Sequence, residues 1–457
     1  MDLRTILSPT QPYPAVRTPG QVTERRPIRR RRLFGLLCWA GFAIAIAPPV
    51  RHIAEQSPLL ALAPVAGLAG GYLLLVQILL MSRLPVLERW LGSTGLRLWH
   101  RGLGPLVLLL VLGHVALAVT GRMLADHRPA VDESLRLLTG YRGMVSAFLA
   151  TGLLCGIGIL AVGQLRRRLP YEFWYFLHTT AYLVVAFSYV HEFLDGHELR
   201  GPGPARSYWL GLYLLVSLAL LYGRVLIPLR LNLRHRLRVH QVVPEGAGTI
   251  SIYFTGRQID RLAARAGQYF RWRFLARGLW WQAHPFSLSA APNSRWLRIT
   301  VKMVGDHTSR LRRLRPGVPV FVEGPSGDFT VERRRGGRAL LIAGGSGIGP
   351  IRALLEELPP ATVVIYRASS AETLMLRQEL DWLARLRRAR VWYVTGPRNA
   401  PGPRRMFTRT GLLRLVPDLA RRDVYLCGPT SLVLASLRLV RRLGVPPDQI
   451  HMDPFEL

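Results

Sequence analysis

Residues 98–117 read LWHRGLGPLVLLLVLGHVAL, an apolar stretch with His100 near its start and His114 near its end. A helix of this length reaches across a lipid bilayer. An ionisable side chain at bilayer depth is costly and is for that reason a candidate functional group. The stretch therefore predicts a membrane-spanning helix that carries two functional imidazoles.

Five other apolar runs of comparable length lie before residue 230, and 49% of the whole chain is hydrophobic. Helices of a large soluble core would each show one polar stripe, and these runs lack it. The sequence therefore predicts a membrane domain of six transmembrane helices. The six runs are Leu33–Val50, Pro58–Met81, Leu98–Thr120, Gly143–Leu165, Tyr171–Leu194 and Tyr208–Leu229.

Composition excludes several classes of protein. The formal net charge is +34, but the basic residues are spread over the whole chain without a basic helix or an aromatic-studded sheet. Binding to nucleic acid is therefore not expected. Three cysteines, Cys38, Cys155 and Cys427, are too few for a disulfide framework or a four-cysteine iron–sulfur cluster.

The arginines of the loops predict how the helices are oriented. Loops on one side of the six runs hold 17 arginines, and loops on the other side hold 7. Because positively charged loops stay on the cytoplasmic side, both termini are expected in the cytoplasm. We expect a multi-pass protein of the cell membrane, with membrane lipid as its immediate partner.

The pattern of the sequence changes after residue 231. The segments TISIYF (249–254), QYFRWRF (268–274) and WLRITVKMV (296–304) predict antiparallel strands. From residue 338 onward strand and helix patterns alternate, which is typical of a doubly wound parallel α/β domain. The predicted parts are a disordered basic tail (1–32), a six-helix membrane domain (33–230), an antiparallel β-barrel (231–333) and an α/β domain (334–457).

A second pair of histidines lies on the fifth predicted helix. His178 and His191 are 13 residues apart there, and His100 and His114 are 14 apart on the third helix. The two helices run in the same direction, so the histidines fall at two levels roughly 20 Å apart. This arrangement suits two stacked haems, each held by one imidazole from each helix, and such ligation favours electron transfer. A lone histidine at this depth would more often donate an interhelical hydrogen bond.

The spacing of 13 residues has a structural consequence. On an ideal helix it turns two side chains apart by about 140°, whereas a spacing of 14 keeps them within about 40°. The fifth helix must therefore contain a bulge, a loosened turn or a pronounced tilt. We place it in YVHEF (189–193). Outer loops contain His52, His127 and His197, for which solvated or weakly metal-contacting roles are expected rather than haem ligation.

Three short motifs in the second half point to cofactor binding. HPFSLS (284–289) contains an X-Pro turn that holds Phe286 extended and offers the Ser287 hydroxyl. In VKMVGDHTSRL (301–311) a Gly-x-x-Thr turn presents donors to a pyrophosphate. AGGSGIGP (343–350) stands between a strand and a helix, where a glycine turn faces a phosphate. Taken singly, each motif also fits an ordinary strand or tight turn.

Together these features resemble the ferric reductase and NADPH oxidase superfamily. That family fuses a six-helix haem b membrane domain to a ferredoxin-reductase-like flavin and nicotinamide module. The resemblance runs from about residue 33 to the C-terminus and includes YLCGP (425–429) and DPFEL (453–457). It implies FAD, a nicotinamide nucleotide and two haem b groups as cofactors. The implied haem ligands are His100, His114, His178 and His191.

The resemblance also implies roles by position. Ser287 would lie near the reactive nitrogen of the flavin, and Phe455 would shield the flavin until nicotinamide displaces it. Cys427 would lie beside the hydride-transfer centre, or serve only as a small buried apolar residue. The implied FAD contacts are His284, Pro285, Phe286, Ser287, Lys302, Gly305 and Thr308. The implied nucleotide contacts are Gly344, Gly345, Ser346, Gly347, Gly349, Pro350, Arg367, Ser369, Cys427, Gly428 and Pro429.

The expected activity is electron transfer from cytosolic NAD(P)H to an acceptor outside, with a ferric chelate as the first choice. Arg367 with Ser369 and Ser370 suits a 2′-phosphate, which favours NADPH over NADH. Reduction of oxygen to superoxide is the nearest rival activity. The oxidase branch has a further histidine where this chain has Ala118, which favours the reductase. A membrane-anchored flavin reductase without haem and a non-enzymatic haem sensor also stay open. No subunit partner follows from the sequence.

Overall fold

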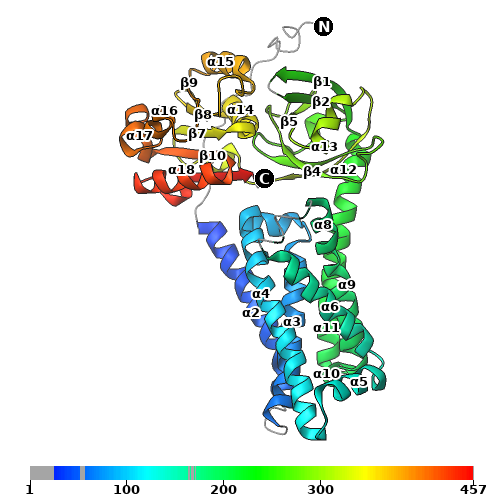
Figure 1. Ribbon diagram of the computed structural model, residues 1–457. Coiled ribbons are helices and arrows are strands. Elements are labelled where there is room, and N and C mark those ends of the chain that lie inside the picture. Colours follow the sequence, from blue (N-terminus) through cyan, green and yellow to red (C-terminus); the bar gives the residue numbers. More distant parts are fainter. Residues whose placement is uncertain are drawn as a thin grey trace. The chain divides into compact units, whose positions relative to one another are not determined.

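The structure of the protein is a computed structural model that describes residues 25–455 except 52–56, 163–164, 166–168, 170 and 247 (Figure 1). It divides between Ile227 and Pro228 into two compact units, and each is described by itself. The predicted basic tail lies outside the described residues as far as residue 24, and so does His52. Arg25 already belongs to a helix, whereas the sequence predicts the first helix from Leu33.

The first unit consists of helices, coloured blue to green in Figure 1. Six stretches among the described residues are long and apolar enough to cross a membrane, which confirms the predicted number. The sixth stretch continues from α11 through a π-helical turn into α12. The helices are α2 (Arg25–Val50), α3 (Pro58–Leu80), α4 (Pro85–Asp126), α5 (Ala130–Gly140), α6 (Met144–Ala161), α8 (Tyr171–Thr179), α9 (Ala181–Leu194), α10 (His197–Arg200), α11 (Pro204–Leu220) and η2 (Leu221–Leu226), and α12 (Ile227–His235) continues from η2 into the second unit.

Helix α3 is the most buried of the six stretches. Its glycines let neighbouring helices approach closely. A Cβ atom on Gly67 would lie 2.8 Å from Nδ1 of His114, and one on Gly71 would lie 2.7 Å from Oε1 of Glu192. The hydrophobic effect does not bring helices together in lipid, so transmembrane helices associate through close packing at small residues. Helix α3 therefore fixes the positions of functional side chains on both α4 and α9.

The second unit begins with an antiparallel barrel made of two three-stranded sheets, β1-β2-β5 and β4-β3-β6. A bridge between Leu288 and Ile299 links the two sheets. Aromatic side chains fill the interior, where Phe254 and Trp272 stack with their ring centres 4.3 Å apart. The antiparallel prediction is confirmed. The strands are β1 (Arg238–Gly246), β2 (Thr249–Thr255), β3 (Tyr269–Phe274), β4 (His284–Ser287), β5 (Leu297–Lys302) and β6 (Val320–Ser326).

A five-stranded parallel sheet of order β11-β10-β7-β8-β9 follows, yellow to red in Figure 1, and confirms the predicted α/β fold. The chain runs from β7 outward to β9 and then returns to the other side of β7. The topological switch point, where ligands of such sheets bind, is therefore between β7 and β10. The elements are β7 (Arg338–Gly344), α14 (Ile348–Glu357), β8 (Val363–Arg367), α15 (Arg377–Leu386), β9 (Arg390–Val394), α16 (Pro401–Met406), α17 (Arg409–Leu415), β10 (Arg422–Pro429), α18 (Thr430–Arg442) and β11 (Ile450–Phe455).

Candidate functional site

The structure brings the four membrane histidines together in two pairs. The ring centres of His100 and His178 are 5.9 Å apart, and those of His114 and His191 are 6.4 Å apart. A metal ion held between two imidazoles, with about 2 Å for each metal–nitrogen bond, places the ring centres roughly 6 Å apart. The described residues contain no cluster of three or more metal-binding side chains. Each pair therefore has the separation expected of two imidazoles that share one metal.

Main-chain carbonyls of α3 orient two of these rings. Nδ1 of His114 donates to the carbonyl oxygen of Ala63 at 2.7 Å, and Nδ1 of His100 lies 3.4 Å from that of Gln77. A carbonyl only accepts, so Nδ1 carries the hydrogen and Nε2 keeps its lone pair. This is the tautomer that a metal-binding histidine needs. The sequence did not point to Ala63 or Gln77. These two residues are 14 apart on α3, which is also the spacing of their partners on α4.

The fifth span contains the irregularity that its histidine spacing requires, but at a different place. Helix α8 ends at Thr179 and α9 begins at Ala181. At the break Thr180 forms tight turns, with its amide donating to Leu177 and its carbonyl accepting from Leu183. Its hydroxyl also donates to the carbonyl of Leu177 at 2.7 Å. The expectation of a break is confirmed, and its assignment to residues 189–193 is wrong, because threonine hydroxyls compete for backbone carbonyls here.

A partly buried carboxyl that the sequence analysis did not single out, that of Glu192, lies beside the second histidine pair. The hydroxyl of Tyr213 on α11 donates to Oε2 of Glu192 at 3.0 Å. Asp195, one turn after His191, has a carboxylate oxygen 3.6 Å from Nδ1 of that histidine. Gly143 makes room for this corner, since a Cβ atom there would lie 2.8 Å from Asp195 Oδ2. The signal in the sequence was the acidic residue inside an apolar run.

In the barrel the HPFS residues form strand β4, paired with β3. Ser287 lies opposite Tyr269, and the indole nitrogen of Trp272 donates to the carbonyl of Phe286 at 3.0 Å. The rings of His284 and His307 are 3.8 Å apart between their centres. Burial, and then the charges of His284 and Arg310, lower the pKa of His307 to about 4. At neutral pH the ring of His307 is therefore uncharged, and it lies against the ring of His284 at the start of β4.

The Gly-x-x-Thr segment forms the predicted turn. Gly305 precedes the short helix α13 (Asp306–Arg310). Oγ1 of Thr308 accepts from the amides of Val304 and Gly305, both at 3.1 Å, and donates to the carbonyl of Gly305 at 3.0 Å. The hydroxyl thus holds the turn in shape and does not point a free hydrogen outward. Lys302 is exposed at the end of β5.

The glycine motif forms a strand, a turn and a helix, as the sequence predicts. Strand β7 ends at Gly344, the turn η6 covers Gly345–Gly347, and α14 begins at Ile348. Gly345 has φ of +53°, which favours glycine. A Cβ atom on Gly347 would lie 2.5 Å from the carbonyl oxygen of Cys427. The turn therefore packs backbone to backbone against β10 at the switch point.

The YLCGP segment completes this edge of the sheet. Cys427 is 1% exposed, and burial raises the pKa of its thiol well above the ordinary value. The group is a neutral thiol and not a nucleophile. Pro429 pairs in register with Phe455 of β11, whose ring packs on the core of the nucleotide domain. The structure thus brings Gly344–Pro350, Cys427–Pro429 and Phe455 to one edge.

Arg367 does not point a free guanidinium at this edge. It ends β8, and its Nη atoms donate to the carbonyls of Ala368, Val394 and Gly396. Ser369 lies 3.2 Å from Thr373 between hydroxyl oxygens. The donors of Arg367 are largely used in joining β8 to the end of β9.

Other arginines that sequence reasoning passed over are exposed nearby. Arg398, after β9, donates from Nη2 to the hydroxyl of Ser431 at 2.9 Å, next to the start of α18. An open pocket of about 350 Å³ adjoins it. In a chain this rich in arginine, the sequence offered no signal to single them out. The pocket is lined by Asn399, Pro401, Arg404, Arg405 and Thr408.

Comparison with known families divides the chain in the same way. Residues 66–189 match a family described as ferric reductase like transmembrane component. Residues 236–328 match an FAD-binding domain, and residues 341–436 match an oxidoreductase NAD-binding domain. The order is that of the predicted membrane, barrel and α/β domains. The first match includes three of the four histidines and ends two residues before His191.

Individual relatives are similar over part of their length. The ferredoxin reductase component of a 3-ketosteroid-9-alpha-monooxygenase from Mycolicibacterium smegmatis is 30% identical over 48% of this chain and 65% of its own. A flavohemoprotein from Chromobacterium violaceum is 31% identical over 42% of this chain and 53% of its own. This chain thus spans half to two thirds of these relatives. Among solved structures, the cytochrome b5 reductase domain of Ulva prolifera nitrate reductase is 17% identical, with a TM-score of 0.42, over 48% of this chain and 97% of its own.

Proposed function

This chain has the domain architecture of the ferric reductase and NADPH oxidase superfamily, and from that premise we propose that it carries electrons across a membrane. The donor is NADPH on the cytoplasmic side, and the acceptor on the outer side is a ferric chelate. The path runs through FAD at the barrel and two haem b groups at the histidine pairs. Each NADPH oxidised reduces two ferric ions and releases one proton on the cytoplasmic side.

The observation that carries this proposal is the spacing of the two histidine pairs, 5.9 and 6.4 Å between ring centres. When bound, FAD turns a two-electron hydride into single electrons and haem iron accepts them singly. Each haem would be held by one imidazole from α4 and one from the fifth span, His100 with His178 and His114 with His191. The contacts of Nδ1 with Ala63 and Gln77 keep the rings turned toward the metal.

The residues of the second unit bind and orient the donor. The turn from Gly344 to Pro350 offers backbone amides at the start of α14 to the phosphates of the nucleotide. Strand β4 presents Ser287 to the flavin. The surplus of arginines on one set of loops, 17 against 7, supports a cytoplasmic location for both termini in the cell membrane.

An absorption spectrum tests the proposal directly. Purified protein is expected to show two low-spin b haems that become reduced when NADPH is added under anaerobic conditions. A colourless protein made with ample porphyrin supply would favour the membrane-anchored flavin reductase instead. Haem that stays oxidised in the presence of NADPH would favour the sensor.

The acceptor is tested in membrane vesicles supplied with NADPH. We expect iron(II) to form from a ferric chelate much faster than superoxide forms from oxygen, because this chain has Ala118 where the oxidase branch has a histidine. If superoxide forms rapidly and without iron, the proposed ferric reductase activity is wrong and the protein is an oxidase.

The choice of NADPH leads to a prediction about Arg398. Replacing it by alanine is expected to lower the ratio of kcat/KM for NADPH over NADH by roughly 10-fold or more, because a charge-assisted hydrogen bond to phosphate is lost. Arg414→Ala, exposed on α17, is the control. Steady-state assays with both nucleotides give the ratio. If Arg398→Ala keeps the ratio while Arg367→Gln loses it, the phosphate is bound at the residue that the sequence pointed to.

A further inference from the structure

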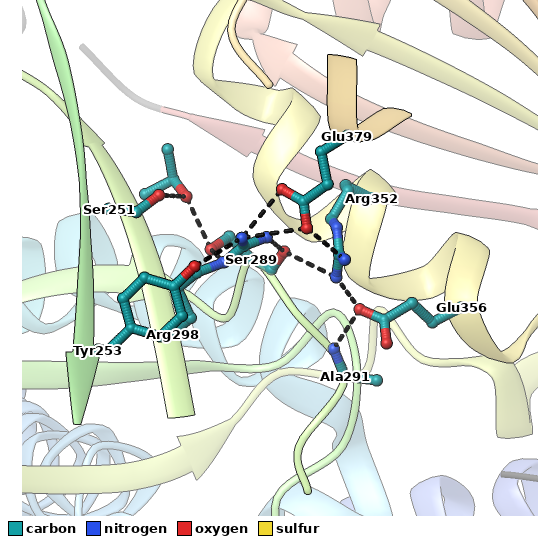
Figure 2. Close-up of polar contacts among 9 residues, drawn as sticks. Ser251, Tyr253, Ser289, Ala291, Arg298, Arg352, Glu356 and Glu379 are labelled. Carbon is teal, nitrogen blue, oxygen red and sulfur yellow. Dashed lines mark hydrogen bonds and ion pairs between the residues drawn. The ribbon is translucent and has the colours of Figure 1, made fainter. Parts of the chain in front are cut away.

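Four charged side chains, three of them buried and Glu379 only 11% exposed, join the barrel to the nucleotide domain (Figure 2). Nη1 of Arg298, on β5, donates to both carboxylate oxygens of Glu379, on α15, at 3.1 and 2.9 Å. Arg352, on α14, forms ion pairs with Glu379 and with Glu356. Arg298 is 2% exposed and Arg352 is 3% exposed. The cluster is neutral, and one carboxylate, that of Glu379, bridges an arginine from each domain.

The same arginines hold the segment that follows the flavin strand. The carbonyl of Ser289 accepts from Nη2 of Arg298 at 2.7 Å and from Nη1 of Arg352 at 3.5 Å. The Ser289 hydroxyl accepts from Nε of Arg298 at 3.0 Å. The amide of Ala291 donates to Oε1 of Glu356 at 3.0 Å. Figure 2 shows Ser289 among the guanidinium contacts, with Ala291 bonded separately to Glu356.

The cluster therefore lies between two cofactor-binding segments. Ser289 comes two residues after Ser287 of β4, and Arg352 comes two residues after Pro350 of the glycine turn. The segments also touch directly, since a Cβ atom on Gly349 would lie 3.5 Å from the Cβ of Ser289. Any shift in the cluster changes the distance between the flavin strand and the nucleotide turn.

We propose that Glu379 is a positioning residue for hydride transfer, which fixes the nucleotide turn against the flavin strand by bridging Arg298 and Arg352. This role rests on the proposed function, in which a nicotinamide delivers a hydride to FAD at this junction. The polar partners of Glu379 are the guanidiniums of Arg298 and Arg352. It acts through the two guanidiniums and the carbonyl of Ser289.

The energetics of this cluster indicate that it aligns the two domains more than it adds to the stability of the fold. Buried ion pairs add little net stability compared with apolar packing, but they demand one geometry. Burial opposes ionisation of Glu379, yet the two arginines outweigh it and hold the pKa of the carboxyl below its usual range. Apolar contacts also hold the domains together, because Ala291 and Phe329 share a core with Leu354 of α14. Loss of Glu379 is therefore expected to shift the domains without separating them.

The test uses the full chain with FAD bound and stopped-flow mixing with NADPH without oxygen. In Glu379→Gln we expect flavin reduction per bound FAD to be about 100-fold slower, since a misplacement of about 1 Å has an effect of that size. The dissociation constant for NADPH should change by less than about threefold, and Glu379→Asp should be intermediate. Asp381→Asn, a half-exposed carboxylate on the same helix, should keep the wild-type rate.

Two further measurements do not depend on turnover. The long-wavelength charge-transfer absorbance between bound nicotinamide and flavin should weaken in Glu379→Gln. Amide hydrogen exchange at Ala291 should rise, because its acceptor Glu356 loses the orientation that Arg352 gives it. Should Glu379→Gln not fold, Glu356→Gln replaces it. That variant keeps an acceptor oxygen for Ala291 but removes the negative charge beside Arg352, and a rate several-fold below wild type is expected.

The outcomes separate the two ideas. If neither NADPH nor NADH reduces the wild-type flavin, the proposed function is wrong and the positioning role falls with it. If the wild type is reduced and Glu379→Gln matches it in rate per flavin and in charge-transfer absorbance, only the positioning role is wrong. A wild-type rate in Glu356→Gln, where Glu379→Gln does not fold, also counts against the positioning role.

Discussion

The variant His114→Ala is expected to bind one haem where the wild type binds two, and to reduce external ferric chelate no faster than vesicles that lack the protein. His114 is the better oriented member of its pair, with Nδ1 donating to Ala63 at 2.7 Å, so its loss removes both a ligand and the anchor of the ring. A metal left with one imidazole has an open axial position and is held weakly. NADPH should still reduce the haem that remains at His100 and His178.

The measurements are a pyridine haemochrome count per polypeptide, an anaerobic spectrum with NADPH, and iron(II) formation in vesicles. His197→Ala is the matched control, because that side chain is 93% exposed. His191→Ala should give the same loss as His114→Ala. Two haems per chain in both variants would show that this pair binds no metal, whatever the rest of the chain does.

The membrane part was predictable in outline because lipid imposes one rule on every span. A segment that crosses must be apolar for about 20 residues and satisfy its own backbone, so composition alone reveals it. An ionisable side chain is costly to place in lipid, so a histidine in such a segment stands out as a candidate functional residue. For these reasons the six spans follow from the sequence, and the structure pairs His100 with His178 and His114 with His191 as the sequence predicts.

The details around the histidines were not predictable, because they depend on how helices pack. The carbonyls of Ala63 and Gln77 are backbone groups that every residue carries, so no letter in the sequence marks them. The break at Thr180 was demanded by the spacing of His178 and His191, but its place depends on which hydroxyl finds a carbonyl. The helical periodicity shows that the span must be irregular somewhere between His178 and His191, but it does not show where.

In the second unit, structural features that depend on neighbouring residues were predicted better than contacts between residues far apart in the sequence. Strand alternation and the glycine turn are local, and both follow from the sequence. The bridge from Arg298 to Glu379 joins residues 81 apart and depends on tertiary packing. Arg367 shows the opposite failure: it lies at the expected end of β8, but nearby carbonyls take up its donors. A position in a motif does not reveal which partner a long side chain chooses.

The variant Gly347→Ala is expected to lose NADPH-dependent reduction of the flavin, because the turn at Gly347 has no room for a Cβ atom. The added Cβ would lie 2.5 Å from the oxygen and 2.6 Å from the carbon of the Cys427 carbonyl, and 2.8 Å from the amide nitrogen of Gly428. All three are backbone atoms of a central strand, so the turn must move instead. Overpacking of this kind costs about 1–3 kcal/mol of folding stability, and the displaced amides no longer meet the phosphates.

Flavin reduction by NADPH is expected to fall by about 100-fold or more in Gly347→Ala, since the hydride donor is misplaced. FAD content should stay at the wild-type value, because the barrel has a core of its own, and dithionite should still reduce the flavin. Gly337→Ala is the matched control, as a Cβ atom there meets nothing within 4 Å. Stopped-flow traces with NADPH and with dithionite separate the two effects. Wild-type reduction by NADPH in Gly347→Ala would mean that the nucleotide is bound away from the switch point between β7 and β10.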